Sequence, residues 1–218
     1  MSATPRPVLH RLAVAELLAR LRNRLSGWVP GDEDLRIGPF PAAEAARVRH
    51  LFPAEPRRAA VLIPLIERDD DLHVLLTYRA ADLDHHAGQI SFPGGRLEPG
   101  DPDPEAGALR ETEEEIGLAR KFVEVLGRLP DHVVITGFRV TPVVGLIRPG
   151  YSLRPEPDEV ARVFEAPLRH LFDPGTHTPR VYRVGNEELT SYDLPWQEHR
   201  IWGATAGMLL TLKEVLEE

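Results

Sequence analysis

A helix that ends just before Gly117 is the most firmly bounded element of this sequence. Asp103 can cap the first turn, Pro104 suits the first helical position, and Gly117 can adopt the left-handed conformation that closes a helix. Leu109 and Ile116 lie on one face of such a helix, since side chains seven residues apart return to the same side. Whatever the chain folds into, it must therefore bury one face of this helix.

Apolar and β-branched runs on both sides of this helix predict strands rather than further long helices. The first two runs, AAVLIPLIE and LHVLLTYR, are joined by three aspartates that suit a turn. Strands mixed with a few helices indicate one α+β domain. The predicted strands cover 59–67, 72–79, 90–92, 123–128, 138–147, 161–165 and 181–184, and a final helix is expected at 204–217.

The first 57 residues differ from the rest, and we expect an N-terminal helical and proline-rich extension (1–57) before a domain at 58–218. Apolar residues recur at helical spacing until Ser26 and Gly27 supply a stop, and a short helix is expected at 42–51. Such a basic amphipathic helix packs on its own domain, on a partner or on a membrane surface, and we favour packing. Its apolar positions are Val14, Leu17, Leu18, Leu21 and Leu25.

Charge and composition exclude several classes of partner. Lys and Arg number 26 against 34 Asp and Glu, a net charge of −8, so the chain has no general attraction for nucleic acid or anionic lipid. The absence of cysteine removes disulfides, thiolate metal sites and cysteine nucleophiles. No apolar run approaches the roughly 20 residues that span a bilayer, and no signal peptide is evident. We expect a cytoplasmic protein with no nucleic-acid partner and no stable membrane insertion, and we leave a homodimer open.

Three glutamates crowd the last turns of the predicted helix. Glu111, Glu114 and Glu115 have spacings of three and four residues, which bring side chains together. Two like charges about 4 Å apart cost about 4 kcal/mol at an effective dielectric of about 20, and acids at a helix C-terminus also oppose its dipole. The alternative is a solvated acidic face, but such violations of local rules tend to mark function. A bound divalent cation would remove both the charge repulsion and the conflict with the dipole, and carboxylate oxygens suit Mg²⁺ or Mn²⁺. Arg110 can also pair with Glu114, one turn later.

The segment before the helix offers groups that can bind a phosphate. Gly94 and Gly95 allow a close backbone approach to a diphosphate and permit positive φ. Arg79, at a predicted strand end, can contact a phosphate oxygen, although a lone arginine is more often a solvated surface cation. His85 and His86 would point to opposite faces of a strand and so not share a metal, and we expect His86 in a loop or at the substrate. The sequence holds no G-x-x-x-x-G-K-S/T loop and no G-x-G-x-x-G before a helix.

The helix region resembles the Nudix box, whose core reads Arg-Glu-x-x-Glu-Glu-x-Gly after an upstream glycine. This resemblance implies a Nudix hydrolase with an α+β fold, in which a mixed β-sheet lies between helices. It also implies that Glu111 and Glu115 hold the principal cation and that Glu114 is a further ligand or the base, with Arg110 completing the catalytic set. The matching positions are Arg110, Glu111, Glu114, Glu115, Gly117 and Leu118, with Gly95 as the upstream glycine.

The match departs from the box at two places. Gly95 lies one residue further upstream than usual, so that Pro102 falls where a glutamate is expected. An insertion near residues 99–100 explains this spacing and leaves Glu98 or Asp101 as the local acid. Thr112 also replaces the usual aliphatic residue.

The stretch upstream of the box resembles the coenzyme A diphosphatase subfamily of Nudix hydrolases. That signature reads approximately Leu-Leu-Thr-x-Arg-Ser/Ala, a spacer with a basic residue, then Gly and Phe-Pro-Gly-Gly. Here Asp84 stands where the basic residue usually is. The matching residues are 75–80, Leu83, His86, Gly88 and 92–95, and resemblance continues at 137–145, 159–160, 163–164, 167–168 and 201–206.

This second resemblance implies a substrate and the residues that bind it. Coenzyme A or an acyl-CoA is expected to be split into 4′-phosphopantetheine and adenosine 3′,5′-bisphosphate. The alternative substrates are ADP-ribose, a dinucleotide or a nucleoside triphosphate, and the alternative class is a Nudix-fold sensor without catalysis. The expected substrate-binding residues are Arg79, His86, Phe92, Gly94 and Gly95.

Overall fold

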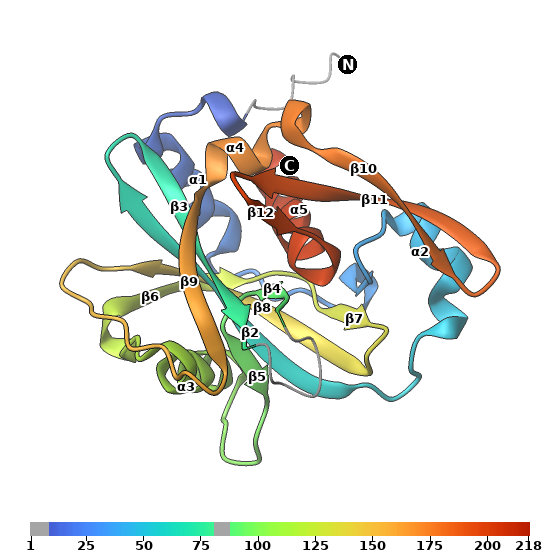
Figure 1. Ribbon diagram of the computed structural model, residues 1–218, viewed down its shortest axis with the longest axis horizontal. Coiled ribbons are helices and arrows are strands. Elements are labelled where there is room, and N and C mark those ends of the chain that lie inside the picture. Colours follow the sequence, from blue (N-terminus) through green and yellow to red (C-terminus); the bar gives the residue numbers. More distant parts are fainter. Residues whose placement is uncertain (1–8, 81–87) are drawn as a thin grey trace.

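The computed structural model describes residues 9–80 and 88–218 and confirms the α+β fold, with one large mixed sheet at its centre (Figure 1). This sheet has the order β1-β7-β8-β2-β3-β4, with β5 paired to β2, β6 to β8 and β9 to β3. A second sheet has the order β10-β11-β12. The strands are β1 (Arg36–Ile37), β2 (Arg57–Arg68), β3 (Asp71–Arg79), β4 (Ile90–Ser91), β5 (Gly94–Arg96), β6 (Val123–Arg128), β7 (His132–Val134), β8 (Phe138–Ile147), β9 (Val160–Pro167), β10 (Thr178–Val184), β11 (Glu187–Trp196) and β12 (His199–Ile201).

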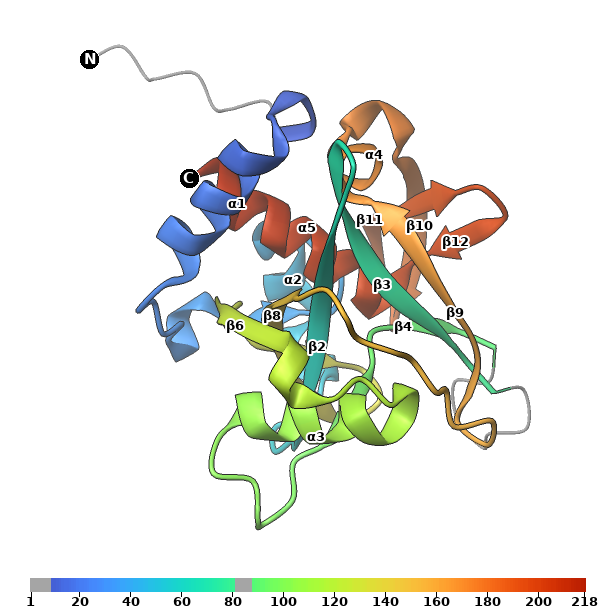
Figure 2. The ribbon, with the colours of Figure 1, turned by 90° about the vertical axis from the view of Figure 1, so that its left-hand side faces the viewer.

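Helices cover both faces of the large sheet (Figure 2). On one face α3 buries Ala108 and Ile116 in a cluster with Ala60 and Leu62 of β2. On the other face, side chains of α1, α4 and α5 form a larger cluster. The helices are α1 (Val14–Leu25), α2 (Ala42–Val48), α3 (Pro104–Ile116), α4 (Leu168–Phe172) and α5 (Gly203–Glu217), with 3-10 turns at Leu9–Arg11, Asp32–Asp34, Arg49–Leu51, Arg120–Phe122 and Pro174–Thr176.

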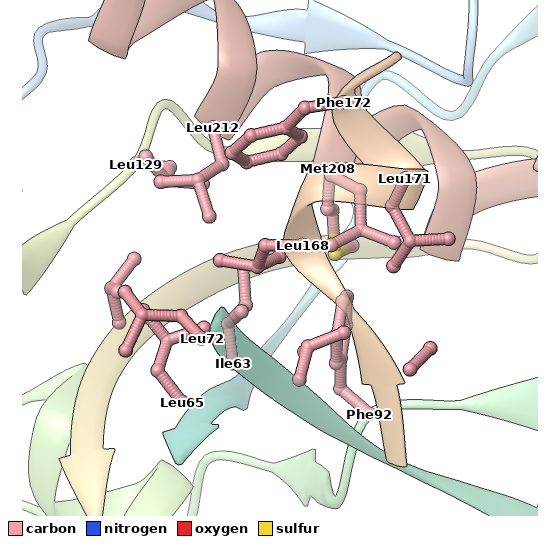
Figure 3. Packing of buried hydrophobic residues seen from close by; sticks show 14 of the residues in the cluster. Ile63, Leu65, Leu72, Phe92, Leu129, Leu168, Leu171, Phe172, Met208 and Leu212 are labelled. Carbon is pink, nitrogen blue, oxygen red and sulfur yellow. The ribbon is translucent and has the colours of Figure 1, made fainter. Parts of the chain in front are cut away.

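The two central strands explain why the chain buries so much apolar surface. β2 and β8 pair in parallel along ten residues of register, and parallel strands covered on both faces are apolar on both faces. Ile63 and Leu65 of β2 belong to the same cluster as Phe172 of α4 and Leu212 of α5 (Figure 3). Full burial of one such side chain stabilises the fold by about 1.5–3 kcal/mol.

The N-terminal helix α1 is part of this core. Leu17, Leu21 and Leu25 are at most 2% exposed and belong to the larger cluster. Arg20 Nε donates a hydrogen bond to the carbonyl of Leu216 in α5. Packing on its own domain, the favoured interpretation of this amphipathic helix, is therefore what the structure shows. Within residues 9–80 and 88–218, no helix is long and apolar enough to cross a membrane.

The second sheet is the part of the fold that the sequence predicts least well. Only β10 was expected, and it begins at Thr178, three residues before the predicted start at 181. Strands β11 and β12 alternate buried and exposed residues, a pattern typical of a half-covered sheet. The helix α2 packs against this sheet, where the Glu44 carboxylate accepts a hydrogen bond of 2.7 Å from the Thr190 backbone.

The buried imidazole of His132 on β7 makes the stability of the fold depend on pH. The residue is 1% exposed, its Nε2 lies 3.1 Å from Oγ1 of Thr211 in α5, and burial lowers its pKa to about 4. The unfolded chain keeps a pKa of about 6.5 and binds the proton first, so stability is lost as the pH falls from about 6.5 to 4, by about 3 kcal/mol. We expect His132→Gln, which does not titrate, to lose less unfolding free energy over this range in denaturant titrations. Parallel pH curves for the two proteins would refute this.

Candidate active site

Capping residues fix the helix α3 where the sequence places it. The Asp103 carboxylate accepts a hydrogen bond of 2.8 Å from the backbone N–H of Ala106. Gly117 has φ 68° and donates its N–H to the Glu113 carbonyl at 2.9 Å. These two caps fix where α3 begins and ends. The packing of its buried face sets the rotation of α3 about its axis, and this rotation decides where each glutamate points.

Glu115 is the most buried carboxylate of the expected site. It is 4% exposed, and its Oε2 accepts a hydrogen bond of 3.0 Å from the backbone N–H of Gly94. Arg79 Nη1 lies 3.8 Å from Oε1. Burial raises the pKa of Glu115 to about 7, the Gly94 N–H and Arg79 oppose this shift, and the nearby charges of Glu159 and Glu111 add to it. A cation at this position would favour the ionised carboxylate.

Glu111 lies one turn earlier against the neighbouring glycine. A Cβ atom at Gly95 would stand 2.4 Å from Glu111 Oε2, so the absence of a side chain at Gly95 makes room for the carboxylate. Burial raises the pKa of Glu111, an effect that the ion pair with Arg110 partly offsets. Gly94 and Gly95 lie in the strand β5, so a strand and not a loop carries the two glycines.

Glu114 does not join the other two glutamates. Its side chain is 60% exposed, and its Oε2 lies 3.1 Å from Arg110 Nη1. The pairing of Arg110 with Glu114 is thus confirmed. Within residues 9–80 and 88–218, no three carboxylate or imidazole groups stand together as a ready set of metal ligands. Glu111 and Glu115, beside the two glycines, are the nucleus of the candidate site.

Arg110 links these groups to the loop before α3. Its Nη1 lies 3.0 Å from Glu111 Oε1, while its Nε and Nη2 lie 3.1 and 2.9 Å from the two carboxylate oxygens of Asp101. The Asp101 side chain is 7% exposed, and its ion pair with Arg110 lowers its pKa. Of the two acids that the spacing leaves open, Asp101 is the one that pairs with the arginine of the box.

Glu159 is a residue of the site to which sequence analysis assigns no role. Its negative charge contributes to raising the pKa of both Glu111 and Glu115. Its carbonyl accepts a hydrogen bond of 2.8 Å from the N–H of Ala80, directly after Arg79. The one signal in the sequence is that 159–160 falls in a segment of resemblance, which gives no chemical role.

The three other expected substrate-binding residues, besides Gly94 and Gly95, have different environments. Arg79 is near Glu115, and its Nε is buried without a hydrogen-bond partner among the described residues. Phe92 is 3% exposed and packs in the larger core. His86 lies outside the described residues, as does Asp84.

Comparison with known proteins identifies the family of the chain. The family model described as NUDIX domain matches residues 56–184. Proteins named "Uncharacterized Nudix hydrolase NudL" from Salmonella paratyphi B (strain ATCC BAA-1250 / SPB7) and Salmonella newport (strain SL254) are 46% identical over 158 residues, 72% of this chain and 81% of each relative. The crystal structure of a Nudix hydrolase from M. smegmatis, RenU, covers 73% of this chain and 85% of its own at 21% identity, with a TM-score of 0.51, and thus shares the fold. The chain belongs to the NUDIX domain family and is a Nudix hydrolase.

Proposed function

We propose that this Nudix hydrolase cleaves the diphosphate of coenzyme A or an acyl-CoA to 4′-phosphopantetheine and adenosine 3′,5′-bisphosphate. The observation that carries the proposal is the burial of Glu111 and Glu115 against Gly94 and Gly95. The two carboxylates have raised pKa values, and the two glycines beside them leave the backbone open to a ligand. This arrangement suits a divalent cation that binds a diphosphate. Support for coenzyme A comes from the signature residues upstream, since the names of the relatives leave the substrate open.

The donor atoms at this position fit a divalent cation. Nudix hydrolases generally use such ions, and hard carboxylate oxygens suit Mg²⁺ or Mn²⁺. Glu111 and Glu115 would hold the ion, and because Mg²⁺ retains waters and binds substrate phosphates, two or three protein ligands suffice. Glu114 is the proposed third ligand or base. When bound, the ion neutralises the diphosphate oxygens and makes a water a better nucleophile.

The residues of the chain have separate tasks in this proposal. Arg110 fixes Glu111 and Glu114 through its guanidinium. Arg79, whose Nε has no hydrogen-bond partner in the described part of the chain, could donate to a phosphate oxygen. Glu159, whose carbonyl is bonded to the N–H of Ala80 directly after Arg79, is a second candidate to accept the proton of the attacking water. His86 remains a proposed substrate contact.

We also propose the division of the chain into an extension (1–57) and a catalytic domain (58–218), and a cytoplasmic location. The family model begins at residue 56, close to the proposed boundary. In the structure α1 of the extension packs in the same hydrophobic core as the domain. The boundary therefore marks where the match to the family begins, and it does not separate two independently packed units.

Product analysis tests the proposed reaction. Incubation with coenzyme A and Mg²⁺ or Mn²⁺, followed by mass spectrometry, should yield 4′-phosphopantetheine and adenosine 3′,5′-bisphosphate in equal amounts. ADP-ribose, a dinucleotide and a nucleoside triphosphate, measured side by side, should show lower kcat/KM. A higher kcat/KM for any of these would transfer the proposal to that substrate, and tight binding without turnover of all four would indicate a sensor.

A further inference from the structure

A cavity of about 410 Å³ lies where the N-terminal extension meets the end of the large sheet. Three arginines and several apolar side chains line it, and none of its lining residues in the described part of the chain is an aspartate or a glutamate. We call it the arginine cavity. Its arginines are Arg49, Arg58 and Arg139, and its apolar residues include Leu35, Pro56 and Val133.

The strand register places two of these arginines side by side. Arg58 of β2 is the partner of Arg139 of β8 in the parallel pairing, and Val133 of β7 is the antiparallel partner of Arg139. Partners in register point to the same face of a sheet, on strands about 4.8 Å apart. Like charges directly beside each other on one face destabilise a sheet, so this row needs a negative charge.

Only one of the three arginines is neutralised within residues 9–80 and 88–218. Arg139 forms ion pairs with both Asp32 and Asp131. Arg49 and Arg58 form no ion pair and no side-chain hydrogen bond with the described residues. A lone arginine on a flat surface is satisfied by water, but these two share a hollow with a third cation. An anion bound in the cavity would offset their repulsion.

The extension and the family domain build this cavity together. Leu35 and Arg49 come from the extension, whereas Arg58 and Arg139 lie within residues 56–184, which match the family model. Arg49 belongs to the 3-10 turn that follows α2. The cavity therefore depends on the docked extension, and a ligand that bridges Arg49 and Arg58 would also hold the extension on the domain.

The arginine cavity is close to the candidate active site but separate from it. Arg58 precedes Ala60 by two residues, about 7 Å along the strand, and so points to the face of β2 that α3 covers. Ala60 pairs with Gly95, against which Glu111 lies. No residue of α3 or β5 lines the cavity, so a ligand in it is not the diphosphate proposed for cleavage.

We propose that the arginine cavity binds a phosphate monoester carried on an apolar or ring-bearing group. The dianion matches Arg49 and Arg58, which can form charge-assisted hydrogen bonds with its oxygens, and the rest of the ligand packs on Leu35 and Val133. The inference goes beyond the proposed function and does not depend on which diphosphate is cleaved. The phosphate belongs either to a free small molecule such as a nucleotide or to a part of the substrate distant from the diphosphate.

Calorimetry with phenyl phosphate and benzoate tests this site. EDTA in the buffer prevents a divalent cation from holding the phosphate at the candidate active site. Wild type should bind phenyl phosphate more tightly than benzoate, which has the same ring and a single charge. Arg49→Gln and Arg58→Gln should each weaken the binding of phenyl phosphate by at least about tenfold, the value of a charge-assisted hydrogen bond.

Arg57→Gln is the matched control for Arg58→Gln. Arg57 is exposed like Arg58 and adjacent to it, but it points to the opposite face of β2, where its Cζ atom lies 4.3 Å from the centre of the Phe138 ring. Arg57→Gln should leave the affinity within about twofold of wild type. Three results would overturn the inference: no saturable binding to wild type, equal affinity for benzoate, or an equal loss in Arg57→Gln and Arg58→Gln.

Kinetics with Mg²⁺ identifies the source of the phosphate. If it belongs to the substrate, phenyl phosphate should compete with coenzyme A, and Arg58→Gln should raise KM with little change in kcat. If it belongs to a free molecule, KM should stay within about twofold in Arg58→Gln, while phenyl phosphate raises the unfolding midpoint of wild type and not of this variant. A wild type that binds phenyl phosphate but does not cleave coenzyme A would refute the proposed function and leave this inference intact.

Discussion

Replacing Glu111 with glutamine should lower kcat by about 10³-fold, because the loss of one cation ligand removes several kcal/mol of transition-state stabilisation. Glutamine has the same shape and a neutral side chain, so it still fits in the space above Gly95. Burial raises the pKa of Glu111, and removal of this partly desolvated charge should leave the free energy of unfolding unchanged or slightly higher.

Steady-state kinetics at saturating Mg²⁺ or Mn²⁺ measures this effect, with Glu113→Gln as the control. Glu113 belongs to the same turns of α3, but its side chain is 46% exposed and its nearest cation, Arg120 Nε, is 4.0 Å away. We expect Glu113→Gln to keep wild-type turnover. If Glu111→Gln also keeps near-wild-type turnover, the assignment of a cation to this cluster is wrong.

Alanine at the two neighbouring glycines should have different effects: Gly94→Ala should lose stability, and Gly95→Ala should lose activity. At Gly94 a Cβ atom would stand 2.4 Å from the Ala60 carbonyl oxygen and 2.5 Å from Val61 Cα, and the backbone has φ 146°. Backbone atoms inside a sheet cannot move aside, so Gly94→Ala should lower the free energy of unfolding by about 3 kcal/mol or more. At Gly95 the three atoms nearest to the Cβ atom all belong to the end of the Glu111 side chain. Gly95→Ala should therefore fold, with kcat/KM lowered about 100-fold by the displaced carboxylate.

Denaturant unfolding and kinetics on the same two variants distinguish these effects. Gly94→Ala should shift the unfolding midpoint strongly, whereas Gly95→Ala should lie within about 1 kcal/mol of wild type. Equal destabilisation in both variants, or an active Gly95→Ala, would show that the contact between β5 and Glu111 does not position the carboxylate.

Local signals in the sequence were sufficient for α3 and for the central strands. Asp103, Pro104 and Gly117 act within one helical turn of the residues they cap, and the structure has α3 at Pro104–Ile116 as expected. The predicted strands 123–128 and 138–147 coincide with β6 and β8. The two-residue strand β1 could not be predicted, because only its parallel pairing with β7, almost 100 residues away, makes it a strand.

For the site too, the sequence predicts the residues that local spacing brings together and misses those that distant contacts bring in. Glu111 and Glu115 could be placed together from helical spacing alone. That spacing also grouped Glu114 with them, but the rotation of α3, set by packing on β2, directs Glu114 toward solvent and Arg110. Asp101 and Glu159 approach the site only after the loop and the sheet have folded, so no local pattern in the sequence reveals them.

Binding of Mn²⁺ tests most directly whether Glu111 and Glu115 hold a divalent cation beside Gly94 and Gly95. Free Mn²⁺ gives an electron paramagnetic resonance signal that decreases on binding, so titration of wild type, Glu113→Gln and Glu111→Gln/Glu115→Gln yields the affinity of each. We predict that wild type and Glu113→Gln bind Mn²⁺ alike and that the double variant binds it at least about 100-fold more weakly, a loss of about 3 kcal/mol. Equal affinity in all three proteins would contradict the account.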